Sequence, residues 1–316
     1  MMKRFWIVIL LVALMATMLI SGCSKDDDDD TESKFETLIN YMDANGMTIA
    51  DLTSGWIVGA DSTLNATLSD YYILDLRGAD TDENGVVDYE DGHVPGAVLV
   101  NFSNLLDMAD DVDKPIIVVC YTGQSAGHAV MALRLSGYMD AKVLKWGMSG
   151  WNSDFDKWTG NVDQLNHDKW VAAPGDIMAN ETFDMPNLDA AGSTGEEILT
   201  ERVAAMLAAS FKGIAAIDVL DATEDYFINN YWSEADVIQY GNIETAYRIN
   251  PLVLENLNPD ETIVTYCWTG QTSSMLTAYL TVLGYDAKSL KFGANSMIYD
   301  NLESHKWGGS ADWDYE

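Results

Sequence analysis

The sequence has few basic residues. Its 316 residues include 17 lysines and arginines against 50 aspartates and glutamates, which gives a formal net charge of -33 at pH 7. A chain this acidic repels the phosphate backbone of nucleic acids and the anionic surface of membranes, so we expect neither as a direct binding partner. The hydrophobic content of 48%, with 10 tryptophans, argues against a disordered acidic chain and indicates packed globular domains.

Cysteine and histidine are also scarce. The chain has 3 cysteines and 4 histidines, and no histidine pair stands at the spacing of metal ligands. A zinc or haem site is therefore not expected. His128 follows the second cysteine in a helical pattern, and we interpret it as a solvent-facing residue, with tuning of the nearby thiolate as the alternative.

The sequence has one long hydrophobic run near its start, Phe5 to Ile20, which follows Lys3 and Arg4 and precedes Cys23. This segment resembles a bacterial lipoprotein signal peptide over residues 1–22, and the resemblance implies that Cys23 is lipidated. Residues 23–34 are acidic and poor in apolar side chains, which predicts a flexible tether. We expect a lipid-anchored protein of the cell envelope, on the periplasmic or cell-surface side and in the outer membrane if Ser24 directs sorting. A transmembrane anchor is the alternative, but the run is short for a bilayer.

The other two cysteines lie in copies of one segment. VVCYTGQSAGHAVMALRLSGY begins at Val118, and TYCWTGQTSSMLTAYLTVLGY begins at Thr265, so that Cys267 follows Cys120 by 147 residues. Further downstream DAKVLKWG matches DAKSLKFG, and upstream YYILDLR (71–77) is aligned with IAAIDVL (214–220). The chain is therefore interpreted as an internal duplication.

The repeated pattern predicts an α/β fold. A short apolar β-prone run precedes each cysteine and a helical pattern that ends at a glycine follows it, which is typical of a parallel sheet with crossover helices. We expect two domains, each a central parallel sheet flanked by helices: a first half (35–160), an interdomain linker without regular structure (161–195) and a second half (196–316). Leading helices are expected in FETLINYMDANG, in the segment around 47–56 and in EEILTERVAAMLAASF.

Each cysteine is thus predicted at the carboxyl end of a parallel strand and the amino end of a helix. Backbone N–H groups of a tight turn and the positive end of the helix dipole stabilise a thiolate there, so the loop is expected to give an exposed, charged nucleophile. The same loop suits an anionic persulfide. Ser125 and Thr272 are expected to add hydroxyl donors. A disulfide between the two cysteines is disfavoured, because equivalent positions of separate domains seldom come within bonding distance.

The motifs LDLR (74–77), GHVPGA (92–97), CYTGQSA (120–126) and KWGMSGW (145–151) resemble those of rhodanese (sulfurtransferase) domains. The resemblance implies two rhodanese-like domains in which Cys120 is the nucleophile that carries a persulfide, with Asp75, Arg77 and His93 supporting the site. It assigns substrate binding to the two cysteine loops, which comprise Tyr121, Thr122, Gly123, Gln124, Ser125 and Ala126 in the first half and Trp268, Thr269, Gly270, Gln271, Thr272 and Ser273 in the second.

The implied function is transfer of a sulfane sulfur from thiosulfate, a polysulfide or a protein persulfide to a thiol or cyanide acceptor, with no cofactor required. A cysteine-dependent phosphatase is disfavoured because neither loop contains an arginine or lysine to bind phosphate. The non-enzymatic alternative is a cell-envelope binding or scaffold protein. In the second half Leu220 is aligned with Arg77 and GNIETA (241–246) with GHVPGA, so Cys267 is either a second catalytic site or a structural relic.

The first half also contains an acidic insertion, DTDENGVVDYED (80–91). Its spacing resembles an EF-hand or dockerin-like calcium loop and predicts a structural Ca²⁺ site, with an acidic surface turn as the alternative. The predicted ligands are Asp80, Asp82, Asn84, the carbonyl of Val86, Asp88 and Asp91.

Overall fold

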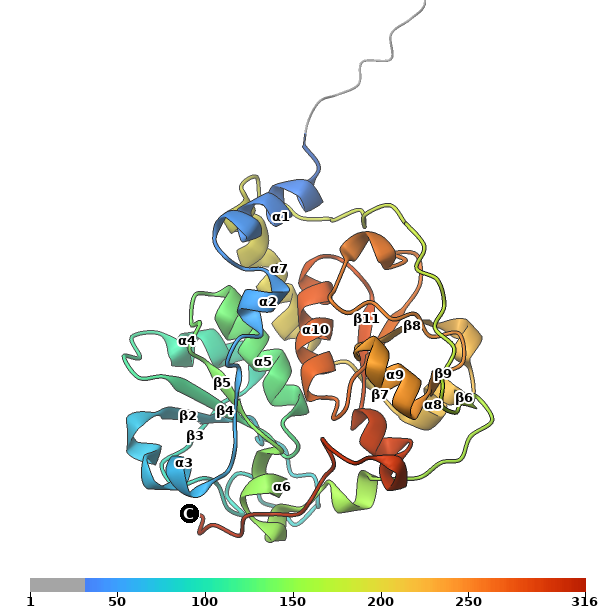
Figure 1. Ribbon diagram of the computed structural model, residues 1–316. Coiled ribbons are helices and arrows are strands. Elements are labelled where there is room, and N and C mark those ends of the chain that lie inside the picture. The colour runs from blue at the N-terminus through green and yellow to red at the C-terminus, as the bar shows by residue number, and fades with distance from the viewer. Residues whose placement is uncertain (1–31) are drawn as a thin grey trace, which may run out of the picture. The chain divides into compact units, whose positions relative to one another are not determined.

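The structure is a computed structural model that describes residues 32–316 (Figure 1). Cys23, the segment 1–22 and most of the expected tether lie outside the described residues. Residues 33–316 form one compact unit. Within the described range no helix combines the length and the apolar character needed to cross a membrane.

The first half is built on a parallel sheet with the strand order β1-β5-β4-β2-β3. Its strands are β1 Ile57–Val58, β2 Tyr72–Asp75, β3 Val98–Leu99, β4 Ile116–Val119 and β5 Lys142–Leu144. The accompanying helices are α1 Lys34–Ala44, α2 Ile49–Leu52, α3 Ser62–Ala66, α4 Leu105–Ala109, α5 Gln124–Leu135 and α6 Gly147–Trp151. The central strand β4 is buried along its whole length, as its continuous apolar run predicts.

The second half repeats this arrangement with the strand order β7-β11-β10-β8, also parallel. Its strands are β7 Gly213–Ile214, β8 Phe227–Asn230, β10 Ile263–Tyr266 and β11 Ala287–Leu290, and its helices are α7 Gly195–Ala209, α8 Ala216–Leu220, α9 Glu234–Tyr240 and α10 Gln271–Val282. The expected α/β class, with central parallel sheets flanked by helices, is confirmed. The leading helices are confirmed as α1, α2 and α7.

One strand assignment from the sequence is wrong. The segment 214–220 is not the counterpart of β2, because it forms the end of the edge strand β7 and the helix α8. The counterpart is β8, which pairs with β10 in the register in which β2 pairs with β4. Asp75 therefore corresponds to Asn230 and Arg77 to Trp232, while Leu220 lies at the end of α8. The similarity of IDVL to LDLR misled the alignment because a short apolar run does not distinguish a strand from a helix.

The expected linker packs against the second half along much of its length. Its strand β6 Trp170–Val171 pairs in antiparallel fashion with β9 Asn242–Ile243. Further along, the N–H of Phe183 donates to the carbonyl of Glu255. Its backbone bonds mainly to elements of the second half, so the segment belongs structurally to that half.

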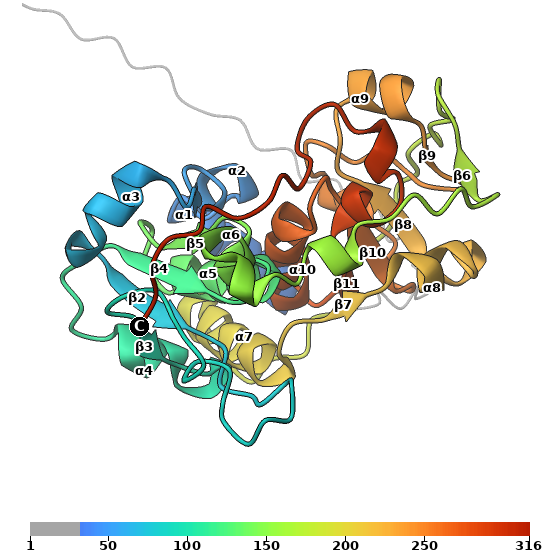
Figure 2. The same ribbon diagram turned by 90° about the horizontal axis from the view of Figure 1, so that it is seen from below.

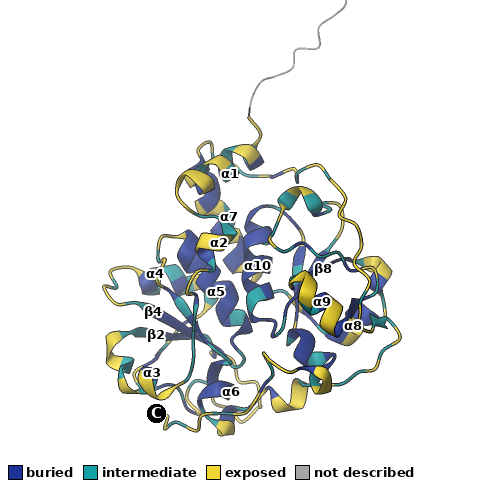
Figure 3. Cartoon of the chain, viewed as in Figure 1, coloured by how far each residue is buried: buried dark blue, intermediate teal, exposed yellow. Residues whose placement is uncertain are grey.

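Helices α5 and α10 pack side by side between the two sheets, as Figure 1 shows in its centre. Both also contact α7, and both are buried over most of their surface (Figure 3), whereas α9 is largely exposed. One hydrophobic cluster contains Val130 and Met131 of α5, Met206 of α7, and Met275 and Leu280 of α10. The two halves therefore share a core.

The last residues return to the first half, and Figure 2 shows this segment running past α6 toward the chain end. The indole N–H of Trp313 donates to the carbonyl of Ala60 at 3.0 Å. The backbones of His93 and Glu316 exchange two hydrogen bonds. The C-terminal segment therefore contributes contacts to the loops of the first half.

Candidate active site

Cys120 directly follows β4, and α5 begins four residues later. Its Sγ accepts the backbone N–H of Gly123 at 3.1 Å and that of Ala126 at 3.4 Å. Gly123 has φ of 81°, a left-handed conformation that turns the chain around the sulfur and that side chains disfavour. Two N–H dipoles aimed at one sulfur stabilise a negative charge on it.

The expected exposure of Cys120 is wrong, because the residue is only 4% exposed. The connection between β2 and β3 contributes residues that cover the loop. The sulfur lines a cavity of about 170 Å³, whose other lining residues are Leu76, Arg77, Ala79, Thr81, Asp88, Tyr121, Thr122 and Ser125. A small reactant therefore has to reach the sulfur through this cavity.

Arg77 and Asp75 form a buried ion pair at the end of β2. The guanidinium donates from Nε to Oδ1 at 3.0 Å and from Nη2 to Oδ2 at 2.7 Å. It also donates to the carbonyl oxygens of Asp88 and Gly92, and its charge lies 5.1 Å from the ring centre of Tyr121. Arg77 thus fixes both the end of the acidic loop and one wall of the cavity. The charge of Arg77 is already balanced by Asp75, so it offers little net positive charge to a substrate.

Asp88 places a carboxylate in the cavity wall. Its side chain is buried and accepts the N–H of Thr81 at 2.9 Å and the hydroxyl of Thr81 at 2.8 Å. Burial raises the pKa of Tyr121, a nearby hydrogen bond with Thr81 opposes this, and the charge of Asp88 raises it further. The cavity wall is therefore electronegative opposite Arg77.

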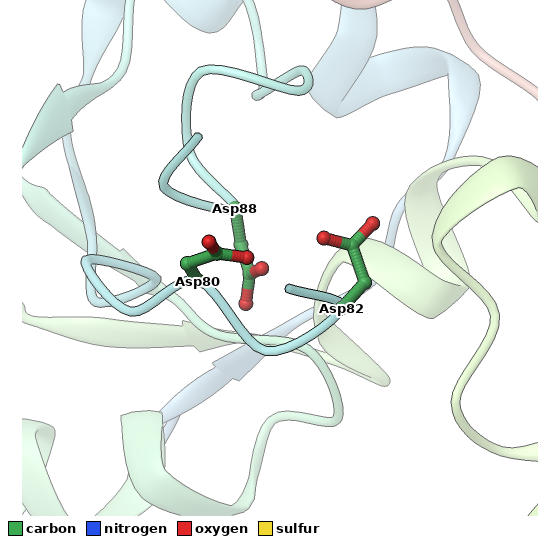
Figure 4. A group of neighbouring side chains, drawn as sticks. All are labelled: Asp80, Asp82 and Asp88. Atoms are coloured by element: carbon green, nitrogen blue, oxygen red, sulfur yellow. The ribbon is translucent and has the colours of Figure 1, made fainter. Parts of the chain in front are cut away.

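The predicted calcium ligands converge only in part. Carboxylate oxygens of Asp80, Asp82 and Asp88 lie within 4.8 Å of one another (Figure 4). The side-chain amide nitrogen of Asn84 donates to both oxygens of Asp91, at 3.0 and 3.1 Å. The side-chain oxygen of Asn84 accepts the N–H of Val86. Three of the predicted ligands are thus close together, and the Ca²⁺ site stays a prediction.

His93 supports the loop rather than the sulfur. Its ring stacks on Tyr89 with centroids 3.9 Å apart, and its Nδ1 lies 3.0 Å from the carbonyl oxygen of Tyr89. Its backbone binds Glu316. His93 therefore holds the end of the acidic loop against the C-terminal segment.

The loop of Cys267 has a different hydrogen-bond pattern. Among the described residues one backbone N–H, that of Ser273, donates to Sγ, at 3.3 Å. The nearby hydroxyl is that of Ser273, 3.6 Å from Sγ, and not that of Thr272 as expected. Ser273 in turn bonds to Ser289 at 2.7 Å. Cys267 is 3% exposed.

The surroundings of Cys267 are aromatic where those of Cys120 are charged. Trp232 and Trp268, which correspond to Arg77 and Tyr121, stack with centroids 4.1 Å apart. His305 stacks on the same Trp268 ring at 5.2 Å. Both Cys120 and Cys267 are free thiols, so the prediction that they form no disulfide is confirmed.

The two loop glutamines cross from one half to the other. The Gln124 side chain accepts the N–H of Phe292 at 2.9 Å through Oε1 and donates to the hydroxyl of Thr122 at 3.1 Å. The Gln271 side chain donates from Nε2 to the carbonyl oxygen of Thr122 at 2.8 Å. Both side chains thus bond across the contact between the halves, and their role in substrate binding stays a prediction.

His128 is not solvent-facing as expected. It is 1% exposed on the side of α5 that meets α7, and its Nε2 lies 3.3 Å from the carbonyl oxygen of Met206. Burial lowers its pKa to about 4, against a smaller opposing effect of the Met206 carbonyl. The helix α5 is apolar on most sides, so His128 lies at the interface with α7 and not on an exposed polar face.

Four residues near the Cys120 cavity were not predicted from the sequence. Leu76, Ala79 and Thr81 line the cavity, and the ammonium group of Lys157 lies 5.1 Å from the ring centre of Tyr121. Leu76 stands next to Arg77 in the motif LDLR, so the sequence could have indicated that it lies near the site. Lys157 lies beyond the last motif, and nothing in its sequence context marks it.

Comparison with known proteins agrees with this geometry. The Rhodanese-like domain family matches residues 60–154. The thiosulfate sulfurtransferase GlpE of Shewanella oneidensis is 33% identical over 82 residues, which cover 25% of this chain and 74% of the relative. The chain belongs to the rhodanese family. GlpE of Pseudoalteromonas translucida is 32% identical over 88 residues, covering 27% of this chain and 77% of that relative.

Solved structures are similar over more of this rhodanese-family chain at lower identity. The 3-mercaptopyruvate sulfurtransferase SseA of Escherichia coli is 20% identical and covers 74% of this chain and 97% of its own, with a TM-score of 0.30. A thiosulfate sulfurtransferase of Pseudomonas aeruginosa is 14% identical and covers 90% of this chain and 49% of its own, with a TM-score of 0.28.

Proposed function

We propose that the protein is a sulfurtransferase in which Cys120 carries a sulfane sulfur as a persulfide. The observation that carries the proposal is the pair of N–H groups, from Gly123 and Ala126, that point at Sγ on the wall of a cavity. Such a site stabilises both a thiolate and the anionic outer sulfur of a persulfide. The matched family region and the relatives named thiosulfate sulfurtransferase support the same chemistry.

The proposed reaction has two displacements. The Cys120 thiolate attacks the sulfane sulfur of the donor, so that a new S–S bond forms at Sγ and the donor's S–S bond breaks. The donor leaves with the bonding electron pair, as a thiolate from an organic persulfide or as sulfite from thiosulfate. An acceptor thiolate or cyanide then attacks the outer sulfur, and Cys120 leaves as a thiolate. The sulfur atom is transferred, and the protein returns to its starting state.

The cavity charges favour a donor of low charge. Arg77 is neutralised by Asp75, and the buried carboxylate of Asp88 stands in the wall. A dianion such as thiosulfate is repelled more strongly by this arrangement than the monoanion of an organic persulfide is. We therefore propose an organic or protein persulfide as donor ahead of thiosulfate, and a thiol as acceptor.

Mass spectrometry after donor exposure tests the function. The wild type, incubated with an organic persulfide and in parallel with thiosulfate, is expected to gain one sulfur on the Cys120 peptide, more readily from the persulfide. Cys120→Ser is expected to lose that gain, and with it the sulfide that is released when a second equivalent of the added thiol reduces the product persulfide and forms a disulfide. Equal sulfide release from the wild type and Cys120→Ser would refute the proposal.

The binding or scaffold alternative draws its support from the burial of Cys120. A scaffold does not require a reactive sulfur. If an alkylating probe modifies Cys120 no faster than it modifies free cysteine at pH 7, and no sulfur is gained from any donor, the scaffold function is the better account.

Cys267 is the second candidate for a persulfide. Its sulfur accepts one N–H where Cys120 accepts two, so we propose that it is the weaker site. The mass experiment distinguishes the cases because two active sites add one sulfur to each cysteine peptide.

We further propose that Cys23 anchors the protein to the cell envelope by a lipid. Metabolic labelling with a fatty acid in a bacterial host is expected to label the wild type and not Cys23→Ala. Labelling of both proteins, or of neither, would exclude the anchor.

A further inference from the structure

The two cysteine loops approach each other closely across the contact between the halves. A side-chain carbon added at Gly123 would lie 2.3 Å from Nε2 of Gln271, and one added at Gly270 would lie 2.4 Å from Oε1 of Gln124. In each loop the absence of a side chain at the glycine leaves the space that the glutamine side chain of the other half occupies. The arrangement is reciprocal in packing but not in hydrogen bonding.

The asymmetry lies at one peptide group. The peptide that joins Thr122 to Gly123 accepts the Gln271 side chain at its carbonyl oxygen, at 2.8 Å. The N–H of the same peptide donates to Sγ of Cys120, at 3.1 Å. A peptide whose carbonyl accepts a hydrogen bond is both held in orientation and polarised, so its N–H becomes a better donor. Gln271 is therefore linked to the Cys120 sulfur through a single peptide.

The second loop provides an internal comparison. Gln124 bonds to the N–H of Phe292 and to the hydroxyl of Thr122, and not to the carbonyl of Thr269. Over residues 32–316, no hydrogen bond runs from the N–H of Gly270 to Sγ of Cys267. In the first loop the glycine N–H donates to the cysteine sulfur, and the carbonyl of the same peptide accepts a glutamine side chain. In the second loop neither of these two hydrogen bonds is present among the described residues.

We propose that Gln271, a residue of the second half, is a positioning residue for the Cys120 site, because it orients the Thr122–Gly123 peptide toward the sulfur. The second cysteine loop thereby has a role in the first site whether or not Cys267 itself reacts. This inference rests on the proposed function only in taking Cys120 as the reacting sulfur.

Gln271 is held firmly enough to orient the Thr122–Gly123 peptide. Gln271 is 1% exposed, and its backbone is fixed at the start of α10, where its N–H donates to the hydroxyl of Thr269. A buried side chain held in this way loses little further conformational freedom when it binds the peptide, so the hydrogen bond retains most of its strength.

The experiment compares Gln271→Met and Gln271→Glu with the wild type. Methionine keeps the length of the side chain but cannot donate, and an ionised glutamate presents an acceptor to the Thr122 carbonyl. The rate of alkylation of the Cys120 peptide is measured from pH 5 to 10 by mass spectrometry, which separates it from the Cys267 peptide. We expect the rate at pH 7 to fall about threefold to tenfold in Gln271→Met, the effect of one lost hydrogen bond, and further in Gln271→Glu.

Ser274→Ala is the matched control, because Ser274 lies at the same contact and touches Gln271 but not the peptide of Thr122. It is expected to leave the Cys120 rate profile unchanged. Thermal unfolding of all variants separates loss of stability from loss of orientation.

A Cys120 profile that is unchanged in Gln271→Met, or that shifts equally in Ser274→Ala, overturns the inference. Alkylation needs no sulfur donor. If the wild type never gains sulfur, the proposed sulfurtransferase function fails while the effect of Gln271 on the thiol is still measured.

Discussion

The two halves share a cysteine loop and the order of four parallel strands, but their polar residues are distributed oppositely. Three core positions that are apolar in the first half are polar in the second, and they pair as Leu74 with Asn229, Val118 with Thr265 and Val130 with Thr277. All six are buried. Within the described part of the chain Asn229 Nδ2, Thr265 Oγ1 and Thr277 Oγ1 have no hydrogen-bond partner.

At the cysteine sites the first half is the more polar of the two. The first half places the buried pair Asp75 and Arg77 beside its sulfur, and the second half has Asn230 and Trp232 there. At these positions the first half therefore combines apolar residues with a charged site, and the second combines polar residues with an aromatic site. Buried charges are costly, so the ion pair beside the Cys120 sulfur distinguishes this site from that of Cys267.

The largest effect is expected from breaking the charged pair. Arg77→Met leaves the Asp75 carboxylate buried without its partner and should lower the free energy of unfolding by about 3–5 kcal/mol. Urea denaturation at pH 7 measures it. Asp75→Asn combined with Arg77→Met removes both charges, as in the second half, and should cost less than Arg77→Met alone. An additive or greater loss in the double variant would contradict the comparison.

The next effect concerns His128, whose equivalent in the second half is Met275. Its pKa is about 4 when folded and 6.5 as the ordinary value, so the unfolded chain binds the extra proton between these pH values. Stability from the neutral ring is complete above pH 6.5 and is lost as the pH falls toward 4, by about 3 kcal/mol in full. His128→Met should remove this component, which the difference in unfolding free energy between pH 7 and pH 4.5 reports. Identical pH dependence in both proteins would refute the assignment.

A smaller gain is expected from making the second core resemble the first. Thr265→Val and Thr277→Val remove hydroxyls without partners while keeping their shape, and each should raise the free energy of unfolding by about 1 kcal/mol. Val118→Thr and Val130→Thr in the first half are the matched changes and should destabilise. Thermal or urea unfolding checks both pairs, and a stabilising effect of the first-half changes would contradict the interpretation.

The smallest effect tests the acidic loop, which the second half replaces with α9. If Ca²⁺ binds at Asp80, Asp82 and Asp88, a free concentration equal to the dissociation constant should stabilise the protein by about 0.4 kcal/mol. Asp80→Asn with Asp82→Asn should abolish both this gain and the heat of binding in calorimetry. No heat from the wild type at millimolar Ca²⁺ would exclude the site.

The sequence predicted the elements whose signal is local. The buried strands before each cysteine, the helices after them and the glycine turns were all identified, because an apolar run and a turn residue are read within a few positions. The assignment of 214–220 failed because the true strand, β8, ends in Asn229 and Asn230, which are atypical of buried strands. The burial of Cys120 and His128 was not predicted, because each residue is covered by segments distant in sequence.

The sequence by itself determined the chemistry that is available: two thiols in duplicated loops, an Asp–Arg motif, and membership of a known class of domain. Only the tertiary structure decided how these parts combine. It placed Asn230 and Trp232 at the positions that correspond to Asp75 and Arg77, brought Asp88 into the Cys120 cavity, and bound Gln271 to the peptide that faces Cys120. The physical reason is that packing of α5 against α10 joins residues about 150 positions apart, a distance over which local sequence patterns carry no information.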